Sequence, residues 1–264
     1  MHIGLNSLGL FQWATETQKQ RWLVPQARGE KIACFGLTEP GVGTDVAAIA
    51  STARRKGDAY ILNGEKMWIS LATKADHVLW VGRTDIASGD PHNGLSAFLV
   101  ELNSRGVRRG DLHGKLGVRA GSTGWIAFEN VSVPAENLIG MEGEGFKIAM
   151  SCLDNGRYTV AAGATGLIRA CLEASRKYAL DRQAFGRKIA RFQLIQQKIA
   201  FMVQFYEAAR LLYLRAGWLK NRGMRKSCTT ARTSPPSPVL KTCRNSRRSA
   251  PGCSPPPKML PTAC

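Results

Sequence analysis

The spacing of apolar residues changes along this chain, and the changes limit the folds open to it. Residues 1–30 have a helical pattern that ends at Pro25, with Gly29 closing the connection. From residue 31 to 135 the apolar residues alternate in short runs separated by turn residues. After Gly143 the helical spacing returns. This order predicts a strand-rich region between two helical regions.

The strand-rich region is predicted to form an antiparallel barrel or sandwich, because short strands alternate with regular turn signals. Asn63-Gly64 is a strong signal of this kind and predicts a hairpin turn. The strand after it alternates, so Trp68 and Ser70 are expected to face the same way. Further turns are expected at 56–58, 90–94 and 109–111, and strand cores at 60–62, 67–69, 77–81, 96–100 and 125–128.

The second helical region is predicted to hold two long amphipathic helices. One runs from Gly145 to about Ala179 and the other from about Phe192 to Lys220. Two such antiparallel helices make up half of an up-and-down bundle. A lone pair leaves apolar faces exposed, so we expect two more helices from this chain or from a neighbour.

The formal net charge of +18 raises the question of nucleic-acid binding. Residues 226–264 hold seven Lys or Arg and no acidic residue, whereas elsewhere the basic side chains are scattered among acidic ones. No recognised nucleic-acid motif is present. We therefore predict no nucleic-acid partner, and a moderately basic surface also suits an anionic substrate.

Residues 226–264 also contain eight of the twelve prolines and four of the seven cysteines. This tail has no hydrophobic period and is predicted to be disordered. Its abrupt onset suggests a shifted reading frame, with a natural low-complexity tail as the alternative. The cysteines show no metal-ligand spacing. No apolar run is long enough to span a bilayer and no signal-peptide pattern opens the chain, so a cytoplasmic location is predicted.

A glycine-rich loop, FGLTEPGVGTD at residues 35–45, follows the first strand of the central region. Gly41 and Gly43 permit positive φ and close approach of a ligand to the backbone. Thr38 and Thr44 add hydroxyl groups. Such a loop offers amide N–H groups and hydroxyls to a flat polar ligand, although a Gly-Pro turn by itself is common.

This loop and the segment NGEKMWIS at 63–70 together resemble the acyl-CoA dehydrogenase family of flavoenzymes, as does DRQAFG at 181–186 followed by Phe192 and Gln193. The resemblance covers roughly residues 2–225, with Val42 standing where the family usually has a smaller residue. It implies an FAD-dependent oxidoreductase of fatty acid metabolism that acts on CH–CH groups. A carboxylate takes the α proton of an acyl-CoA thioester, and the flavin takes the β hydride. An electron-transfer partner protein and a homodimer or homotetramer are also implied.

The resemblance assigns several residues to the flavin and the substrate. Leu37 and Thr38 would contact the pyrimidine end of the flavin, Trp68 would pack on the ring, and Ser70 would lie near N5. Thr44 would lie where a flavin or CoA phosphate approaches, and it is also a candidate for binding substrate. The alternatives are a core aromatic residue for Trp68 and a capping residue for Thr44. The loop at 115–123 resembles the family's loop beside CoA and flavin, with a solvated basic turn as the alternative.

Arg182, Phe185 and Gln193 resemble residues that hold the adenine diphosphate of FAD bound to a neighbouring subunit. Arginine suits a pyrophosphate because its planar guanidinium is always charged and donates two hydrogen bonds at once. The alternative for Arg182 is a surface ion pair with Asp181 or Glu173.

Asp154 and Arg157 resemble residues that close the substrate pocket, with helix packing as the alternative for Arg157. Some family members place the catalytic glutamate directly before this arginine, where the present chain has Gly156. Most others carry it in a last domain that we expect to be absent here. Glu207 is rejected because it lies in the middle of a helix. No catalytic base is identified, and the chain as written is expected to be impaired or inactive.

The predicted architecture is α+β. It comprises the end of an N-terminal helical domain at 1–30, an antiparallel β-barrel domain that binds flavin and CoA at 31–137, a partial up-and-down helical bundle at 138–225 and the disordered tail at 226–264. Three alternatives to an acyl-CoA dehydrogenase remain: a non-catalytic flavin-binding fragment, an acyl-CoA oxidase and a basic nucleic-acid-binding protein.

Overall fold

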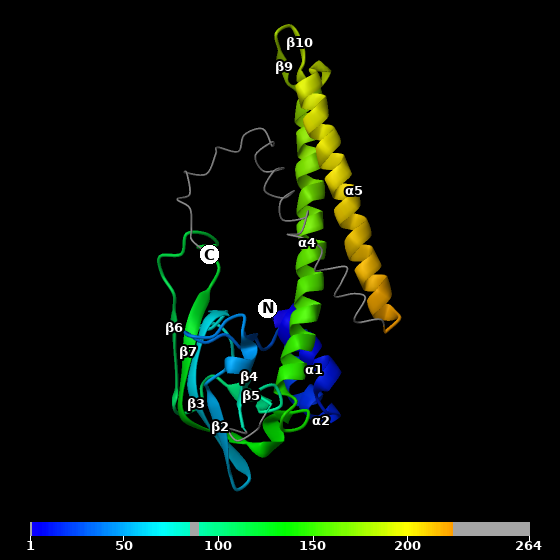
Figure 1. Cartoon of the computed structure of the whole chain (residues 1–264). Helices are drawn as coiled ribbons and strands as arrows, with labels where there is room; N and C mark the ends of the chain where they lie inside the picture. The colour runs from blue at the N-terminus through cyan, green and yellow to red at the C-terminus, as the bar shows by residue number, and fades with distance from the viewer. Residues whose placement is uncertain (1, 85–89, 224–264) are drawn as a thin grey trace. The chain divides into compact units, whose positions relative to one another are not determined.

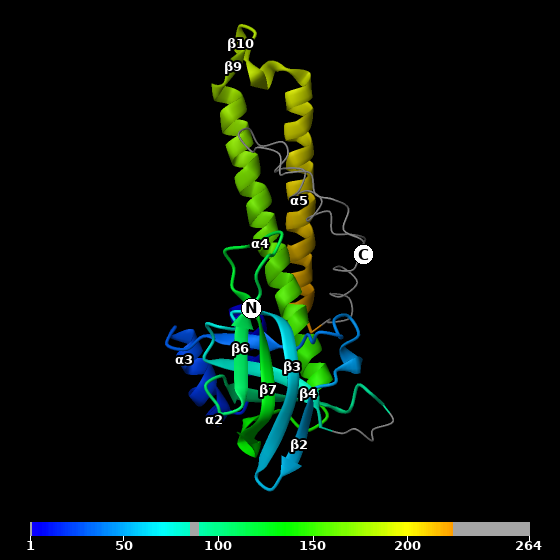
Figure 2. The same ribbon diagram turned by 90° about the vertical axis from the view of Figure 1, so that its left-hand side faces the viewer.

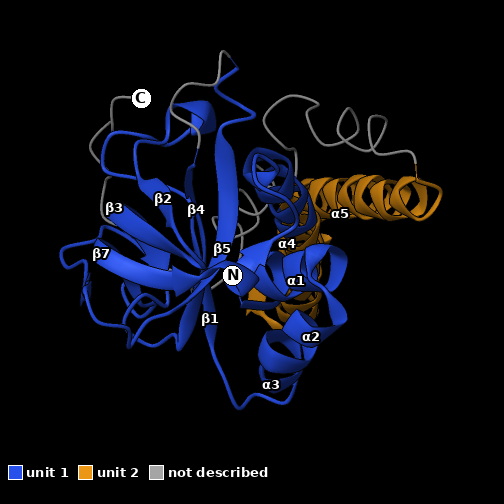
Figure 3. Cartoon of the chain, turned by 90° about the horizontal axis from the view of Figure 1, so that it is seen from below, with its two compact units in different colours: residues 1–156 blue, residues 157–264 orange. Residues whose placement is uncertain are grey.

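The computed structural model describes residues 2–84 and 90–223 (Figure 1). The chain divides into two compact units, residues 1–156 and 157–264, and each is described by itself (Figure 3). The tail predicted to be disordered, at 226–264, lies outside the described residues. Within the described ranges no helix is long and apolar enough to cross a membrane, and no group of three or more His, Cys, Asp or Glu is arranged to hold a metal ion.

The first unit opens with short helical turns: η1 (His2–Ser7), α1 (Leu8–Trp13), α2 (Glu16–Gln18), η2 (Lys19–Leu23) and α3 (Val24–Ala27). A capping box begins α2, because the Thr15 hydroxyl accepts the Gln18 N–H and the Gln18 side chain accepts the Thr15 N–H. Gly29 closes the segment with a φ of 76°. The helical prediction for this segment is confirmed over these turns, but its predicted end at Pro25 is wrong, because Pro25 lies in the first turn of α3 and the helix runs to Ala27.

Eight strands form one mixed sheet, which corrects the prediction of an antiparallel barrel. They are β1 (Ala33–Gly36), β2 (Thr52–Lys56), β3 (Ala59–Ser70), β4 (His77–Arg83), β5 (Leu95–Glu101), β6 (Val107–Asp111), β7 (Thr123–Pro134) and β8 (Leu138–Ile139). Their pairing in the described part of the chain follows the open order β6-β7-β3-β2-β4-β5-β8. Both β1 and β2 run parallel to β4: β1 pairs with its first residues, Ala33 opposite His77, and β2 pairs at its end, Thr52 opposite Arg83.

Asn63 and Gly64 lie inside β3 and not in a hairpin turn, which is a second correction. The turn between β2 and β3 is at Gly57, within the predicted 56–58 segment, with a φ of 59°. At Asn63 the register with β7 shifts, and the Asn63 Oδ1 accepts the N–H of Asn130 at 2.8 Å. Gly64 is required because its φ is 133° and a Cβ there would collide with Ser51.

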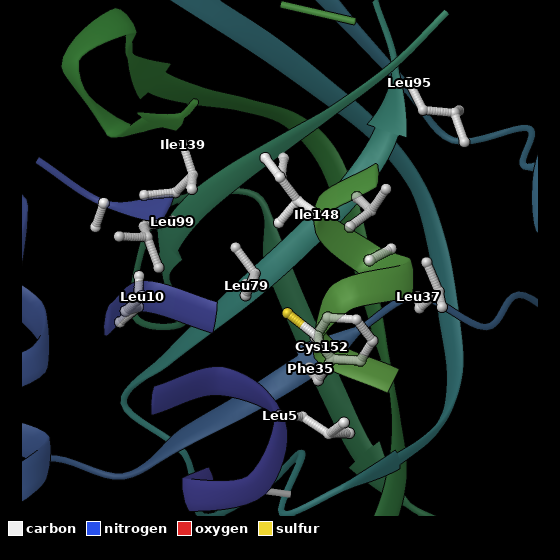
Figure 4. Packing of buried hydrophobic residues seen from close by; sticks show 14 of the residues in the cluster. Leu5, Leu10, Phe35, Leu37, Leu79, Leu95, Leu99, Ile139, Ile148 and Cys152 are labelled. Atoms are coloured by element: carbon white, nitrogen blue, oxygen red, sulfur yellow. The ribbon is translucent and has the colours of Figure 1, made fainter. Parts of the chain in front are cut away.

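Two hydrophobic cores lie on the two faces of the sheet, and β4 contributes to both. Leu79 and Val81 pack in one core with Ile148 (Figure 4). Val78 and Trp80, which alternate with them, belong to the other core. Since both faces of β4 are covered, its sequence is an almost continuous apolar run.

The second unit holds most of α4 (Gly145–Asp181), the hairpin of β9 (Gln183–Ala184) and β10 (Arg187–Lys188), the turn η5 (Ile189–Arg191) and α5 (Gln193–Asn221). The two long helices run antiparallel, as predicted (Figure 2). Their buried contacts are small: Ile168 meets Ala209, and Tyr158 packs on Ala216 and Leu219. Among the residues described, large apolar side chains stay exposed on both helices, namely Val160, Leu167, Tyr178, Leu180, Leu194, Phe201, Val203, Leu211, Leu214 and Trp218.

Candidate functional site

The glycine-rich loop leaves β1 and makes a tight turn over Pro40 and Gly41. The Glu39 N–H donates to the Val42 carbonyl at 2.9 Å, and the Val42 N–H donates to the Glu39 carbonyl at 3.2 Å. Neither Gly41 nor Gly43 has the positive φ that the sequence permits. A Cβ on either glycine would meet nothing within 4 Å. The glycines therefore leave open space beside the loop and do not supply a left-handed turn.

A buried ion pair fixes this loop to β3. The Lys66 Nζ lies 2.7 Å from the Glu39 carboxylate and donates to the Leu37 carbonyl at 3.2 Å. The side chains of Lys66 and Glu39 are 0% and 6% exposed. The Glu39 carboxylate also accepts the N–H groups of Ala50 at 2.8 Å and Ser51 at 3.1 Å. The Glu39 carboxylate thus ties the loop to β3 and to the two residues that precede β2.

The 2.7 Å contact between Lys66 and Glu39 favours the charged form of each. Burial lowers the pKa of Lys66 to about 8, although the neighbouring Glu39 carboxylate favours the charged form. The Lys66 ammonium also lies 5.3 Å from the centroid of the Trp80 ring, which is a cation–π distance. Burial by itself would raise the pKa of Glu39, but the Lys66 charge and the hydrogen bonds from Lys66, Ser51 and Ala50 outweigh it and hold this pKa below its usual value.

Thr38 connects the loop to β3 through its backbone. Its carbonyl accepts the Met67 N–H at 2.8 Å, whereas its own N–H forms no hydrogen bond within the described residues. The Leu37 side chain is 7% exposed and packs in the core, so only the Leu37 backbone is left to face a ligand. The structure therefore brings Leu37 and Thr38 beside the segment that carries Trp68.

Trp68 lies in a bulge of β3. Between Lys66 and Ile69 this strand has one more residue than β7 opposite, and Trp68 there adopts a φ of 61°, which is rare for an aromatic residue. The bulge moves Trp68 off the buried side of the strand, so Trp68 is 58% exposed and Ile69 is 3% exposed. The alternative of a core aromatic residue is therefore wrong. Ser70 is half-buried, and that its side chain faces the same way as Trp68 stays a prediction.

Thr44 is exposed, and its hydroxyl forms no hydrogen bond with the described residues. The short turn after it, η3 (Val46–Ala48), has no side-chain cap, so the capping alternative for Thr44 is wrong.

In the 115–123 loop the Lys115 ammonium donates to the carbonyls of Val118 and Gly121 and to the Thr123 hydroxyl. This lysine holds its own loop together. A contact of the loop with CoA or flavin stays a prediction.

In the second unit the three predicted cofactor residues lie where α4 connects to α5. Phe185 and Gly186 form the two-residue turn between β9 and β10, and both are left-handed, with φ values of 52° and 75°. Phe185 is 93% exposed. Arg182 precedes the hairpin and Gln193 begins α5, and both are exposed.

The surface ion pair considered for Arg182 does not form among the described residues. Glu173 pairs instead with Arg169 at 2.8 Å. Arg187 and Lys188, which the sequence analysis did not single out, are exposed on the same hairpin as Phe185. The connection thus carries several basic side chains, the chemistry that binds phosphate groups.

Asp154 and Arg157 lie three residues apart on α4, where Asp154 is half-buried and Arg157 is exposed. Gly156 stands between them. A Cβ on Gly156 would collide with the Leu5 side chain, so this position has no room for a glutamate unless Leu5 moves.

Sequence reasoning did not assign a role to Glu39 or Lys66, although both stand in the motifs that carry the resemblance. A signal was available for Lys66. It lies an even number of positions from Tyr60 and Leu62 along β3, and both of these residues are buried. Alternation therefore predicts that Lys66 also faces inward, where a buried lysine needs a carboxylate partner.

Comparison with known families gives the class of this protein. Residues 34–131 match the family model of the acyl-CoA dehydrogenase middle domain, and residues 143–241 match that of the acyl-CoA dehydrogenase C-terminal domain. The chain belongs to the acyl-CoA dehydrogenase family, whose members are FAD-dependent flavoproteins.

Individual relatives agree with this assignment. The short-chain specific acyl-CoA dehydrogenase of rat mitochondria is 43% identical over 212 residues, which are 80% of this chain and 51% of the rat protein. The short-chain specific enzyme of Clostridium acetobutylicum is 41% identical over 231 residues, 88% of this chain and 60% of that protein. A chain from a solved structure of the electron transferring flavoprotein of Acidaminococcus fermentans is 40% identical with a TM-score of 0.86, covering 95% of this chain and 66% of that one. The chain spans about half the length of the rat relative.

Proposed function

We propose that this chain binds FAD between the 37–45 loop and β3 and takes part in the α,β-dehydrogenation of an acyl-CoA thioester. The observation that carries the proposal is the exposure and the backbone conformation of Trp68. Trp68 is 58% exposed on a left-handed backbone, next to a Thr38 N–H without an acceptor among the described residues. Exposure and backbone strain of this kind are typical of functional sites, where a ligand covers the exposed group.

The groups at this place fit a flavin. Trp68 offers an aromatic face, Thr38 offers an N–H and a hydroxyl, and Ser70, two residues after Trp68, offers a second hydroxyl. The space beside Gly41 and Gly43 is open. When bound, FAD would accept the hydride from the β carbon of the substrate. The protein's own part would be to bind and orient the ring, with Trp68 packing on it and the Thr38 backbone donating a hydrogen bond to it.

We propose a complementary site at the connection between α4 and α5. Arg182, Phe185 and Gln193 would hold the adenine diphosphate of an FAD bound to a neighbouring subunit. The support is an exposed hairpin with basic side chains and an arginine without an ion-pair partner among the described residues. Such sharing requires a homodimer or a homotetramer.

The substrate contacts, the electron-transfer partner and the division into domains are proposed from the resemblance to the family. Thr44, Asp154 and Arg157 would contact the acyl-CoA, and an electron-transfer protein would reoxidise the flavin. One of the similar solved structures is described as an electron transferring flavoprotein, which agrees with such a partner. The division into 1–30, 31–137 and 138–225 is part of the same proposal. A cytoplasmic location stays a prediction, because one curated relative is named as mitochondrial and another is bacterial.

We also propose that turnover by this polypeptide alone is impaired. Position 156, where some family members have the catalytic glutamate, holds a glycine packed against Leu5. The α proton therefore has no acceptor at this place, and a general base must lie within hydrogen-bond reach of the proton it removes.

The visible absorbance spectrum of the purified chain, reconstituted with FAD, tests these proposals. We expect bound flavin that stays oxidised after anaerobic addition of short acyl-CoA thioesters. Absence of bound flavin would contradict the proposed cofactor site. Bleaching by thioester would show that another carboxylate acts as base and that the chain is active. Protein without thioester, kept anaerobic for the same time, is the control.

A further inference from the structure

We infer that Lys66, held in place by Glu39, polarises the Leu37–Thr38 peptide group and through it raises the reduction potential of bound FAD. The inference rests on the proposed flavin site and assigns a role to a residue that lies beneath it. Lys66 is completely buried and does not face the site. It is therefore a positioning residue, which acts through a single peptide bond.

The geometry of that peptide group carries the argument. The Leu37 carbonyl and the Thr38 N–H are the two ends of one planar, conjugated unit. The Lys66 ammonium donates to the carbonyl end at 3.2 Å, while the N–H end has no acceptor in the described part of the chain. A hydrogen bond at one end of a peptide polarises it and strengthens the donor at the other end. The effect is larger here because the ammonium is shielded from water.

The cost of the buried pair supports a role beyond stability. Removing an ammonium and a carboxylate from water costs several kcal/mol, and apolar residues of similar size are often as stable. Here Glu39 neutralises Lys66 at 2.7 Å and also accepts the N–H groups of Ala50 and Ser51, so the ammonium has one defined position. The pair therefore fixes a charge at a chosen carbonyl more than it adds to the free energy of unfolding.

This arrangement is expected to stabilise the reduced form of the bound flavin more than the oxidised form. Reduction adds two electrons to the ring system, and a protein tunes this step by the hydrogen bonds and charges it aims at the ring. A strengthened N–H donor stabilises the form with more negative charge. Reduced FAD is thus expected to bind more tightly than oxidised FAD, by a margin that depends on the charge of Lys66.

The test uses the full chain and measures the affinity for FAD in both redox states, aerobically for the oxidised form and anaerobically with dithionite for the reduced form. Lys66→Met removes the ammonium and keeps the length of the side chain. The double variant Lys66→Met/Glu39→Gln also removes the unpaired carboxylate and keeps one acceptor oxygen beside the N–H groups of Ala50 and Ser51. In both, we expect the affinity for reduced FAD to fall about tenfold more than that for oxidised FAD, a fall of about 30 mV in the two-electron potential.

Matched controls separate this effect from general loss of charge. Lys147 is an exposed lysine that also pairs with a glutamate, Glu144, at 3.2 Å, so Lys147→Met should leave both affinities unchanged. Lys66→Arg keeps the positive charge. It should therefore retain most of the difference in affinity between reduced and oxidised FAD that the unaltered chain shows.

Each outcome decides the inference. An equal loss of affinity for oxidised and reduced FAD would mean that Lys66 only supports the loop, and unchanged affinities would mean that it has no effect; either result overturns the inference. Circular dichroism checks folding, and the charge-neutral double variant decides where Lys66→Met does not fold. Failure of the unaltered chain to bind FAD would overturn the proposed function as well, whereas binding without the redox difference overturns the inference alone.

Discussion

Protonation of His77 is predicted to destabilise the first unit below pH 6.5. His77 begins β4, is 2% exposed and packs against the Trp22 ring at a centroid distance of 4.9 Å. Its Nε2 lies 2.7 Å from the side-chain nitrogen of Gln26, which also donates to Asn6 at 3.1 Å. An amide nitrogen only donates, so the His77 Nε2 must be the acceptor and the ring must be neutral. A proton on Nε2 would place two donors against each other.

The magnitude follows from the shift in pKa. Burial lowers the pKa of His77 from 6.5 to about 4, although the Asp76 charge acts in the opposite direction. Because the folded value lies below the unfolded one, the unfolded chain takes up the proton first. The stabilisation is present above pH 6.5 and is lost as the pH falls towards 4. Linkage gives a loss of about 2 kcal/mol in the free energy of unfolding between pH 7 and pH 5, a large part of the ~5–15 kcal/mol of a typical domain.

Urea unfolding at pH 7, 6 and 5 measures this loss. His77→Gln keeps an acceptor for Gln26 and does not titrate, so its free energy of unfolding should change much less over the same range. His92→Gln is the matched control, because the His92 side chain is 52% exposed and lies 2.9 Å from the carboxylate of Asp90. Equal pH dependence in the unaltered chain and in His77→Gln would refute the reasoning.

Three further predictions concern single residues. Gly64→Ala should lower the free energy of unfolding by about 1–3 kcal/mol, measured by urea unfolding, because it places a Cβ against Ser51 on a backbone that only glycine adopts easily. Trp68→Ala should change the free energy of unfolding in urea by no more than about 0.5 kcal/mol but weaken FAD binding in a fluorescence titration, since Trp68 is 58% exposed. In Glu39→Gln, thermal unfolding should depend less on pH below 4.5. The lowered pKa of Glu39 adds stability that is present above its ordinary pKa and is lost in acid, and glutamine removes that contribution; an unchanged acid profile would contradict this assignment.

The long helices were predictable because their signal is local. The expected ranges, Gly145 to about Ala179 and about Phe192 to Lys220, agree with α4 and α5 to within two residues. Most strand positions were predictable for the same reason, since a period of two is read over a few residues. The sheet topology was not, because the parallel pairing of β1 with β4 joins residues 44 positions apart, such as Ala33 and His77.

The candidate site divides in the same way. The motifs at 35–45 and 63–70 indicated which segments carry Thr38, Trp68 and Ser70. They did not predict that Asn63-Gly64 continues a strand. The dipeptide favours a turn locally, but the residues on both sides of it pair with β7, and this pairing keeps it in β3. The exposure of Trp68 also depends on the bulge opposite β7, which no local pattern encodes.

The sequence by itself determined the period of each element, the segments of the proposed cofactor site and the family to which the chain belongs. Local spacing carries that information, because it depends only on which residues follow one another. Only the tertiary structure decided that Lys66 and Glu39 meet at 2.7 Å beneath the loop and that Trp68 faces outward. Burial and ion pairing depend on which segments pack together. That packing is decided when the two hydrophobic cores form on the two faces of β4.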